Sequence, residues 1–332
     1  MDEHPLQRHT IATPRGDARG VRAVAGEVLR TGTGAAAVVA AVLMGTTQAS
    51  AVLAQSHGPA HGTLVISGGA ETSSEIYDRF IALAGGPDAL ILVVPTSGNG
   101  ERFDDSCDCL QLLRKAGARN LQLLHTRDRA VANSEVFVAP LKRAKAVWFA
   151  EGNSWKHADA YLDTRVQREL LALLDRGGVV GGGSAGARIQ SDFMPLRGSE
   201  PADRALPEKD RRRGFGLVKN VIIDPHVLAR NRQFDMIGLV NAHPEMIGIG
   251  IDENTAIVVS GDDIEVIGSS YAVIYDDKHQ VAPDATGPNG TPGGLFYFLR
   301  RGDRFNLSTR ESLRPSTGRP ISSVISKPWE PR

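Results

Sequence analysis

From Thr63 onward, short apolar runs alternate with amphipathic segments of helical length. The apolar runs predict strands at 63–67, 90–94, 121–124 and 146–149. The segments between them repeat apolar residues three and four positions apart, which predicts helices at 74–84, 103–116, 134–142 and 162–176. This alternation is typical of an α/β fold in which helices cover a mainly parallel sheet.

The pattern continues beyond a glycine cluster at residues 177–186, although it becomes less regular. Residues 187–194 are predicted to continue as a helix, and the charged stretch 197–214 is predicted to be a long surface loop. A strand at 218–223 is followed by a polar helix, and residues 250–259 read as a turn into a strand. Two further apolar runs, 264–267 and 272–275, are predicted to pair as a hairpin.

The two ends of the chain differ from this body and define the expected organisation. Residues 1–60 are predicted to be a leader and linker, 61–280 a catalytic domain, and 281–332 a Pro- and Gly-rich C-terminal extension. The leader has an apolar run at 34–44 followed by Ala49-Ser50-Ala51, the order of a signal peptide and its cleavage site. We therefore expect export to the periplasm or the medium. The alternative is an alanine-rich extension of a cytoplasmic enzyme.

Charge and cysteine content narrow the classes of partner. The 332 residues contain 38 Lys plus Arg against 38 Asp plus Glu, so nothing favours a nucleic-acid partner. The apolar run of the leader is too short to cross a bilayer comfortably, and no stable membrane anchor is expected after cleavage. Cys107 and Cys109, spaced C-x-C without a nearby histidine, do not form a zinc motif and are expected to be structural or incidental.

The glycine cluster contains the clearest chemical signal. Residues 182–186 read Gly-Gly-Ser-Ala-Gly, the G-x-S-x-G spacing of a nucleophile elbow. Ser184 would sit on a strained strand-to-helix turn, and glycines beside it let the helix and a substrate carbonyl approach. The alternative is a glycine-rich turn that only packs closely or cradles a phosphate.

A serine nucleophile needs a histidine base. His226 is the best placed, because it ends a predicted strand downstream of the elbow, where open parallel sheets collect their site residues. His157 and His243 are alternatives in neighbouring loops. Asp224 is too close in sequence to His226 to orient it.

Acidic residues that could orient the base follow Ser184 in the sequence. Glu200, Asp203 and Asp192 are the candidates. Asp252 and Glu253 are considered instead for a cationic group or a metal. Because no histidine has a metal-ligand spacing to this pair, we predict no metal site.

Backbone donors for an oxyanion are expected at two turns. Gly152 and Asn153, just after the strand at 146–149, can supply N–H groups together with Ala185, which follows the nucleophile. Asn153 or Ser154 can equally cap the helix that follows.

Two arginines after the base suggest the substrate. Arg230 and Arg232 can hold carboxylates with their fork-shaped guanidinium groups, although a solvated helix face is the default for such charges.

Several motifs in one order resemble the cyanophycinase-like branch of the S51 serine peptidases, relatives of dipeptidase E. The likeness runs from about Gly62 to Asp276, on the stretches GTLVISGGAE, VWFAEGNSW, VVGGGSAGA, DPHVLARNRQFD and GIGIDENTAIVV. It implies a three-layer αβα, class I glutamine-amidotransferase-like (flavodoxin-like) fold without a cofactor. It also implies a triad of Ser184, His226 and an acid in the loop after the elbow helix, which points to Glu200, with Asp203 second.

The resemblance further implies a polypeptide substrate with aspartyl residues. Members of this branch cleave the β-linked Asp-Arg unit of cyanophycin, and Arg230 and Arg232 match residues that bind the aspartyl carboxylates. Ser154 and Asp224 fall at further substrate-contacting positions. Relatives are often homodimers, so a homodimer is expected here.

Departures from the family pattern bear on specificity. Ser154 stands where the family commonly has glutamine, and Asp235 stands at a further arginine position. Pro225 interrupts an Asp-Gln-His segment, and Gly183 replaces a threonine or tryptophan. Two other functions therefore stay open: a serine hydrolase of other specificity, such as an Asp-Xaa dipeptidase or esterase, and a non-catalytic carboxylate-binding protein.

Overall fold

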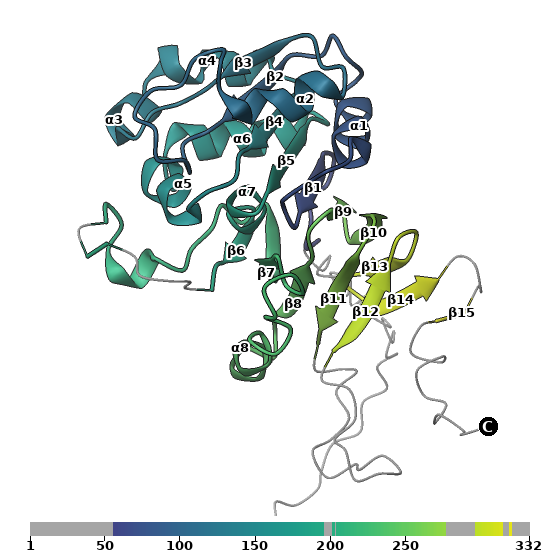
Figure 1. Cartoon of the computed structure of the whole chain (residues 1–332). Helices are drawn as coiled ribbons and strands as arrows, with labels where there is room; N and C mark the ends of the chain where they lie inside the picture. The colour runs from purple at the N-terminus through teal and green to yellow at the C-terminus, as the bar shows by residue number, and fades with distance from the viewer. Residues whose placement is uncertain (1–55, 196–200, 203, 277–295, 315–318, 321–332) are drawn as a thin grey trace, which may run out of the picture. The chain divides into compact units, whose positions relative to one another are not determined.

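The computed structural model describes residues 56–195, 201–202, 204–276, 296–314 and 319–320. Residues 1–55 of the predicted leader and linker therefore lie outside the described residues, as does most of the predicted C-terminal extension. In the described part of the chain, two mixed sheets carry the fold (Figure 1).

The first sheet has ten strands and is half parallel and half antiparallel. Its parallel half is ordered β1-β5-β4-β2-β3, with β1 Thr63–Ser67, β2 Ile91–Val94, β3 Leu121–Leu123, β4 Ala146–Phe149 and β5 Val179–Gly183. These strands confirm the predicted runs. The antiparallel half, β15-β14-β13-β10-β9, joins at β1 and consists of β9 Thr255–Ser260, β10 Asp263–Gly268, β13 Arg304–Asn306, β14 Glu311–Arg314 and β15 Arg319–Pro320.

The second sheet has five described strands in the order β12-β11-β8-β7-β6. They are β6 Ser191–Phe193, β7 Val218–Pro225, β8 Ile247–Ile251, β11 Tyr271–Tyr275 and β12 Tyr297–Arg300. The strands β6, β7 and β8 run parallel. Beyond residue 295, the described segments of the predicted extension are therefore strands of both sheets.

The helices pack on opposite faces of the parallel strands. The principal ones are α1 Glu75–Leu83, α4 Glu135–Arg143, α5 Ser154–Tyr161 and α6 Arg165–Asp175. Shorter ones are η1 Asp108–Leu110, α2 Gln111–Lys115, α3 Arg129–Ala132, α7 Ala185–Arg188, η2 Glu208–Asp210 and α8 Ile237–Ala242. None of the described helices is long and apolar enough to cross a membrane.

Strand alternation divides the core between these faces. In β1, Leu64 and Ile66 belong to the cluster that includes α4, α5 and α6, whereas Val65 points to the cluster of α1 and α2. All three residues are fully buried. Because neighbouring parallel strands are covered on both sides, they read as continuous apolar runs.

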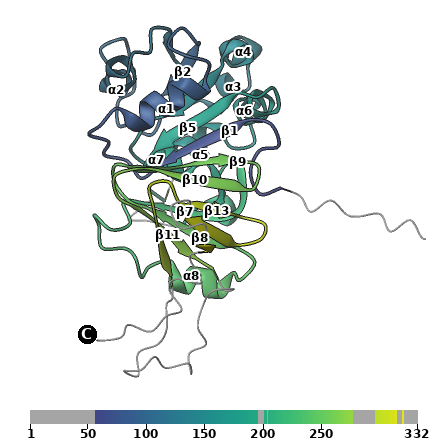
Figure 2. The same ribbon diagram turned by 90° about the vertical axis from the view of Figure 1, so that its right-hand side faces the viewer.

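Four local predictions were wrong. The helix predicted at 103–116 begins only at Asp108, as η1 followed by α2. The runs 264–267 and 272–275 do not pair: β10 forms its hairpin with β9 across a two-residue turn, in which Gly261 has φ +57°, and β11 lies in the other sheet (Figure 2). The helix predicted at 187–194 ends at Arg188, and β6 follows. Residues 227–235 form turns rather than a polar helix.

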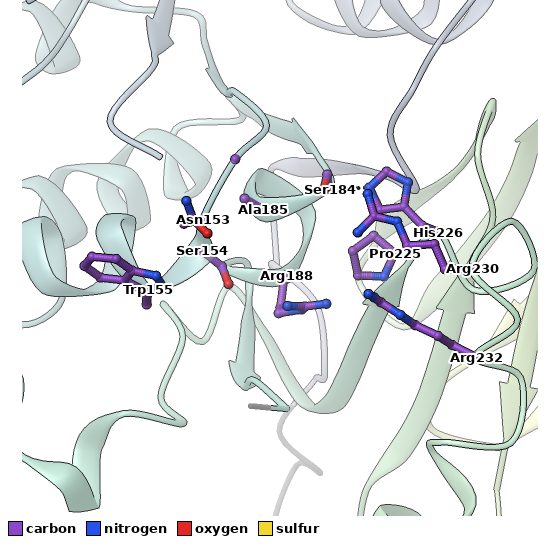
Figure 3. A pocket seen from close by; sticks show the side chains of 11 residues that line it. Asn153, Ser154, Trp155, Ser184, Ala185, Arg188, Pro225, His226, Arg230 and Arg232 are labelled. Carbon is purple, nitrogen blue, oxygen red and sulfur yellow. Dashed lines mark hydrogen bonds between the residues drawn. The ribbon is translucent and has the colours of Figure 1, made fainter. Parts of the chain in front are cut away.

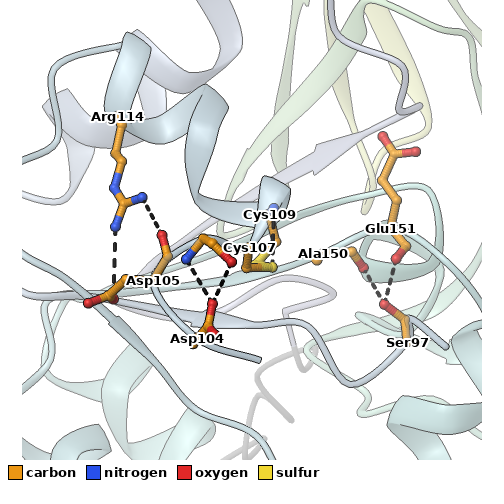
Figure 4. The surroundings of a disulfide bond; sticks show 9 residues. Ser97, Asp104, Asp105, Cys107, Cys109, Arg114, Ala150 and Glu151 are labelled. Carbon is orange, nitrogen blue, oxygen red and sulfur yellow. Dashed lines mark hydrogen bonds and ion pairs between the residues drawn. A yellow bond between two sulfur atoms is a disulfide. The ribbon is translucent and has the colours of Figure 1, made fainter. Parts of the chain in front are cut away.

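A disulfide joins Cys107 to Cys109, whose Cα atoms are 5.1 Å apart (Figure 4). It lies in the turn that enters η1, where the Cys109 N–H donates to the Cys107 sulfur. Both residues pack against the core cluster of α1 and α2. Of the two alternatives for this pair, structural or incidental, these contacts favour the structural one.

Candidate active site

Ser184 occupies the turn between β5 and α7. Its backbone has φ +52° and ψ −105°, a conformation that serine rarely adopts. Glycine is required on both sides, because a Cβ at Gly182 would lie 2.6 Å from the Gly186 carbonyl oxygen, and one at Gly186 would lie 2.1 Å from that of Phe149. The Ser184 N–H donates to the carbonyl of Ser67 at the end of β1, which anchors the turn to the sheet.

His226 directly follows β7 and meets this serine. Its Nε2 lies 2.7 Å from Ser184 Oγ, the distance of a good O–H···N hydrogen bond. Both residues are largely buried, at 9% exposure for Ser184 and 2% for His226. The two residues that the sequence predicts as nucleophile and base are thus in contact.

The acid next to His226 is Glu253. His226 Nδ1 lies 2.8 Å from Glu253 Oε1, on the side of the ring opposite Ser184. Glu200 and Asp203, the acids expected from the sequence, lie outside the described residues. Among the described residues, the arrangement is therefore Ser184–His226–Glu253.

Sheet pairing explains how Glu253 reaches the base. β7 and β8 are parallel neighbours, with Asp224 opposite Gly250 and Pro225 opposite Ile251. Residues that follow the two strands consequently meet at one edge of the sheet. The sequence did contain a signal for this acid: His226 directly follows β7, and Glu253 comes shortly after β8, the next apolar strand along the chain.

Its surroundings tune the basicity of His226. Burial is the largest influence and lowers the pKa of His226, with a smaller lowering by Arg230, while the hydrogen bond to Glu253 raises it. The net lowering favours the neutral imidazole, which can accept the Ser184 proton. We therefore expect kcat/KM to be retained down to a pH below the ordinary histidine pKa of about 6.5 and to fall as His226 protonates. A pH profile of kcat/KM measures this; an acidic limb above pH 7 would contradict it.

The alternative bases and acids lie elsewhere. His157 is fully buried against Phe149, and burial lowers the pKa of His157 to about 3. His243 packs beside Phe193 and lies 3.4 Å from a carboxylate oxygen of Glu245. Asp192 accepts the backbone N–H of Asn220. None of these contacts involves Ser184 or His226.

The predicted oxyanion donors line the same cavity as Ser184, but they are not equivalent. The Asn153 N–H donates to the Ser97 carbonyl at 3.0 Å, so it is directed into the protein. Gly152 has φ +138°, and a Cβ there would lie 2.4 Å from that same carbonyl oxygen. Gly152 and Ala185 are thus the better candidates for the two donors.

Ser97 holds the turn that carries Gly152. Its hydroxyl lies 2.9 Å from the Ala150 carbonyl oxygen and 2.7 Å from that of Glu151 (Figure 4). Together with the hydrogen bond from the Asn153 N–H, these contacts fix the turn from the loop after β2. Ser97 is fully buried, so water cannot replace its hydroxyl.

Replacing Ser97 with alanine is expected to lower kcat about 10-fold with a smaller change in KM, because the loosened turn weakens oxyanion stabilisation more than substrate binding. Ser97→Thr keeps the hydroxyl and should retain more of kcat. Steady-state kinetics of the three proteins measure this. An effect of Ser97→Ala confined to KM would contradict a role in holding the oxyanion turn.

Two further carboxylates flank the site. Glu151 Oε1 accepts the Ala70 N–H at 2.8 Å, and Glu71 bonds to Ser67 and to the Tyr77 hydroxyl. A Cβ on Gly183 would lie 3.2 Å from an oxygen of each carboxylate. Desolvation of its carboxyl group and the neighbouring Glu71 raise the pKa of Glu151 to about 7, although the residue as a whole is exposed.

This raised pKa has a consequence for stability. Between pH 4.5 and about 7 the folded protein holds a proton on Glu151 that the unfolded chain releases, so stability is lost as the pH rises through this range. Glu151→Gln cannot ionise. We therefore expect its Tm, relative to wild type, to be higher at pH 8 than at pH 5, whereas the exposed control Glu208→Gln should show no such trend. Parallel trends for both variants would contradict the assignment.

The cavity beside Ser184 has a volume of about 220 Å³ (Figure 3). Its lining brings together predicted site residues from distant parts of the chain. Two further lining residues, Trp155 and Arg188, were not singled out from the sequence. The complete lining is Gly152, Asn153, Ser154, Trp155, Ser184, Ala185, Arg188, Pro225, His226, Arg230 and Arg232. Asp224, predicted to bind substrate, is fully buried and is not part of this lining. Its Oδ1 accepts a hydrogen bond from Arg188 at 3.0 Å and lies 3.8 Å from Arg232 Nη1.

A buried serine and histidine in contact, with a carboxylate on the far side of the ring, give the geometry of a serine-type hydrolase on an α/β fold. The model of peptidase family S51 matches residues 63–267. The chain belongs to this family of serine-type peptidases.

Curated relatives cover most of the chain. A cyanophycinase of Geminocystis herdmanii is 30% identical over 268 residues, which is 76% of this chain and 96% of that protein. A cyanophycinase of a Nostoc species is 31% identical over 268 residues, 75% of this chain and 87% of that protein. The crystal structure of a peptidase from an acI-B1 Actinobacterium has a TM-score of 0.55 and 24% identity, covering 76% of this chain and 98% of that one, which supports the shared fold.

Proposed function

We propose that this chain is a cyanophycinase-type serine peptidase that hydrolyses an amide bond next to an aspartyl residue. The observation that carries the proposal is the continuous hydrogen-bonded path from Ser184 Oγ through His226 to Glu253, with distances of 2.7 and 2.8 Å. The cyanophycinases among the relatives support the substrate class.

The turn at Ser184 supports its interpretation as a nucleophile elbow. The serine stands between β5 and α7 with a positive φ, and the glycines on either side admit both the helix and a substrate. Helices on two faces of the parallel strands further support a three-layer αβα arrangement of the class I glutamine-amidotransferase type.

The mechanism follows from these positions. His226 accepts the proton of Ser184 as its Oγ attacks the amide carbon, and Glu253 orients the imidazole and stabilises its charged form. The N–H groups of Gly152 and Ala185 stabilise the tetrahedral oxyanion. His226 then protonates the leaving amine, and a water molecule hydrolyses the resulting acyl-enzyme by the same route.

The cavity supports an acidic substrate. Arg230 and Arg232 line it together with the nucleophile, and a guanidinium group matches the geometry of a carboxylate. At about 220 Å³ the cavity is smaller than the roughly 300–1,000 Å³ of sites for drug-sized ligands, which favours a short unit at the end of a chain. This cavity size agrees with exopeptidase action.

Purified protein incubated with insoluble cyanophycin tests the proposal. We expect clearing of the suspension and release of β-Asp-Arg dipeptides, identified by mass spectrometry. Poly-α-aspartate without arginine is the matched control polymer. Turnover of Asp-Xaa dipeptides or simple esters but not of cyanophycin would contradict the proposed substrate while retaining a serine hydrolase.

We also propose that the protein is exported, as the leader predicts. The disulfide between Cys107 and Cys109 supports an oxidising compartment, where such bonds persist. Expression of the full chain followed by N-terminal sequencing of the mature protein tests this: cleavage after residues 49–51 is expected, whereas an intact leader on cytoplasmic protein would contradict export. The homodimer stays a prediction.

A further inference from the structure

Glu151 stands in the turn after β4, directly before Gly152, one of the two proposed oxyanion donors. Its Oε1 accepts the N–H of Ala70 at 2.8 Å, and Ala70 lies in the turn after β1. In the sheet, β1 and β4 flank β5, the strand that leads into Ser184. The side chain of Glu151 therefore joins the two turns on either side of the nucleophile.

This contact passes close to the reacting groups. A Cβ at Gly69, which has φ +94°, would lie 2.9 Å from Glu151 Oε1. The same Cβ would lie 2.9 Å from His226 Cε1 and 3.1 Å from Ser184 Cβ. The carboxyl group of Glu151, the nucleophile and the base thus lie around one glycine, so a change in the position or charge of this carboxyl group acts directly on the catalytic pair.

Other carboxylates surround this group and oppose its ionisation. Glu71 comes from the turn after β1, and Glu253 from the turn after β8. Desolvation of the Glu151 carboxyl group and then the charge of Glu71 raise the pKa of Glu151 to about 7, with a smaller contribution from Glu253. The Ala70 N–H lowers the pKa, because it stabilises the carboxylate. Desolvation and repulsion outweigh this hydrogen bond, so Glu151 is neutral below about pH 7.

Glu71 is the acceptor in this pair of carboxyl groups. It is only 7% exposed, and the hydroxyl groups of Ser67 and Tyr77 both donate to it, the latter at 3.2 Å. Because these donors stabilise a carboxylate, the proton of the pair is assigned to Glu151. A neutral Glu151 can donate to Glu71 while its Oε1 keeps the backbone hydrogen bond. The Tyr77 hydroxyl on α1 and the ring of His226 are two further titratable groups close to Glu151.

We infer that Glu151 is a positioning residue of the proposed reaction, and that in its neutral form it holds the oxyanion turn of Gly152 against the turn of Ala70. The inference rests on the proposed peptidase function and adds a residue to its machinery. When Glu151 ionises, the neighbouring carboxylates repel it and the exposed side chain turns to solvent, which releases the turn of Gly152. Any negative charge that stays beside Ser184 also opposes the oxyanion. Both effects lower kcat.

The pH dependence of Glu151→Gln tests the inference. An amide keeps an acceptor for Ala70 and a donor for Glu71, but it cannot ionise. The kcat of Glu151→Gln on cyanophycin, divided by that of wild type, is expected to rise from about 1 at pH 6 to at least about 5 at pH 8.5. Rates are measured at a temperature where every protein stays folded. The exposed control Glu208→Gln should show a constant ratio. A constant ratio for Glu151→Gln would overturn the inference.

Glu151→Ala separates positioning from stability. This variant lacks the contact with Ala70 at every pH, so at pH 6 its kcat should be about 10-fold below that of wild type with little change in KM. Glu151→Gln should recover most of that loss. If Glu151 affects stability alone, the Tm values of the variants will change with pH while their kcat ratios stay constant, which contradicts positioning. Should Glu151→Ala fail to fold, the kcat ratio of Glu151→Gln decides.

The rate at which a fluorophosphonate probe labels Ser184 provides a readout that does not depend on cyanophycin. If the labelling ratio of Glu151→Gln to wild type rises with pH but cyanophycin is not cleaved, the positioning role stands and only the proposed substrate fails. Cleavage and labelling whose ratios do not change with pH leave the peptidase function standing and overturn the role of Glu151. Absence of both cleavage and labelling in wild type contradicts the proposed function, and the inference falls with it.

Discussion

Ser184→Ala is expected to lower kcat on cyanophycin by at least about 10⁴-fold, because the variant has no Oγ to attack the amide and to form the acyl-enzyme. The fold should be retained: alanine is smaller than serine and meets the same positive φ, so the turn gains no new clash. Initial rates of dipeptide release, with circular dichroism to check the fold, measure the effect.

Ser106→Ala provides the matched control. Ser106 is an exposed serine whose hydroxyl bonds only to Asp104 in the described contacts, so its removal should leave kcat within about 2-fold. A fluorophosphonate probe adds a readout that is independent of the substrate, since it labels an activated serine. We expect labelling of wild type and of Ser106→Ala, but not of Ser184→Ala.

These results also decide between the alternative functions. Retained turnover in Ser184→Ala would refute the serine mechanism. Absence of labelling in wild type would favour the non-catalytic carboxylate-binding protein, while labelling with turnover of esters alone would favour an esterase.

Local sequence was sufficient to predict a strand, helix or turn whose structure is determined by its own residues. The apolar run of β4 and the helical period of α6 were predicted to within a few residues because burial on two faces, or on one stripe, leaves a direct pattern. The turn at Ser184 was predictable for a similar reason: its glycines lie next to it in sequence.

Partners of strands were not predictable in the same way. β10 and β11 are separated by only Ser269 and Ser270, and both alternate like the strands of a hairpin. Yet β10 pairs with β9 and β11 with β8, in different sheets. Which neighbour a strand selects depends on the burial of its two faces in the whole fold, and this is a long-range property.

The base and the acid show the same contrast. His226 could be predicted because it directly ends a strand. Glu253 lies 27 positions further on and reaches the imidazole only through the register of β7 against β8. Sequence reasoning therefore looked for the acid in the loop after the elbow and passed over the turn after β8.

Glu253→Gln tests this placement of the acid. An amide cannot stabilise the imidazolium and can favour the wrong imidazole tautomer, so kcat should fall by about 10²–10⁴-fold with little change in KM. Because Glu253 raises the pKa of His226, the residual activity of the variant should also extend to lower pH than that of wild type. Rates measured from pH 5 to 9 report both effects.

Glu200→Gln is the decisive companion variant, since Glu200 is the acid that the family resemblance favours and Glu253 is the acid in contact with His226. With Glu253 as the orienting acid, Glu200→Gln should keep kcat within about 3-fold of wild type and leave the acidic limb of its pH profile in place. The opposite pattern, with a large loss in Glu200→Gln and a small one in Glu253→Gln, would reassign the acid to the loop after α7. Large losses in both variants would indicate that the His226–Glu253 contact alone does not orient the base.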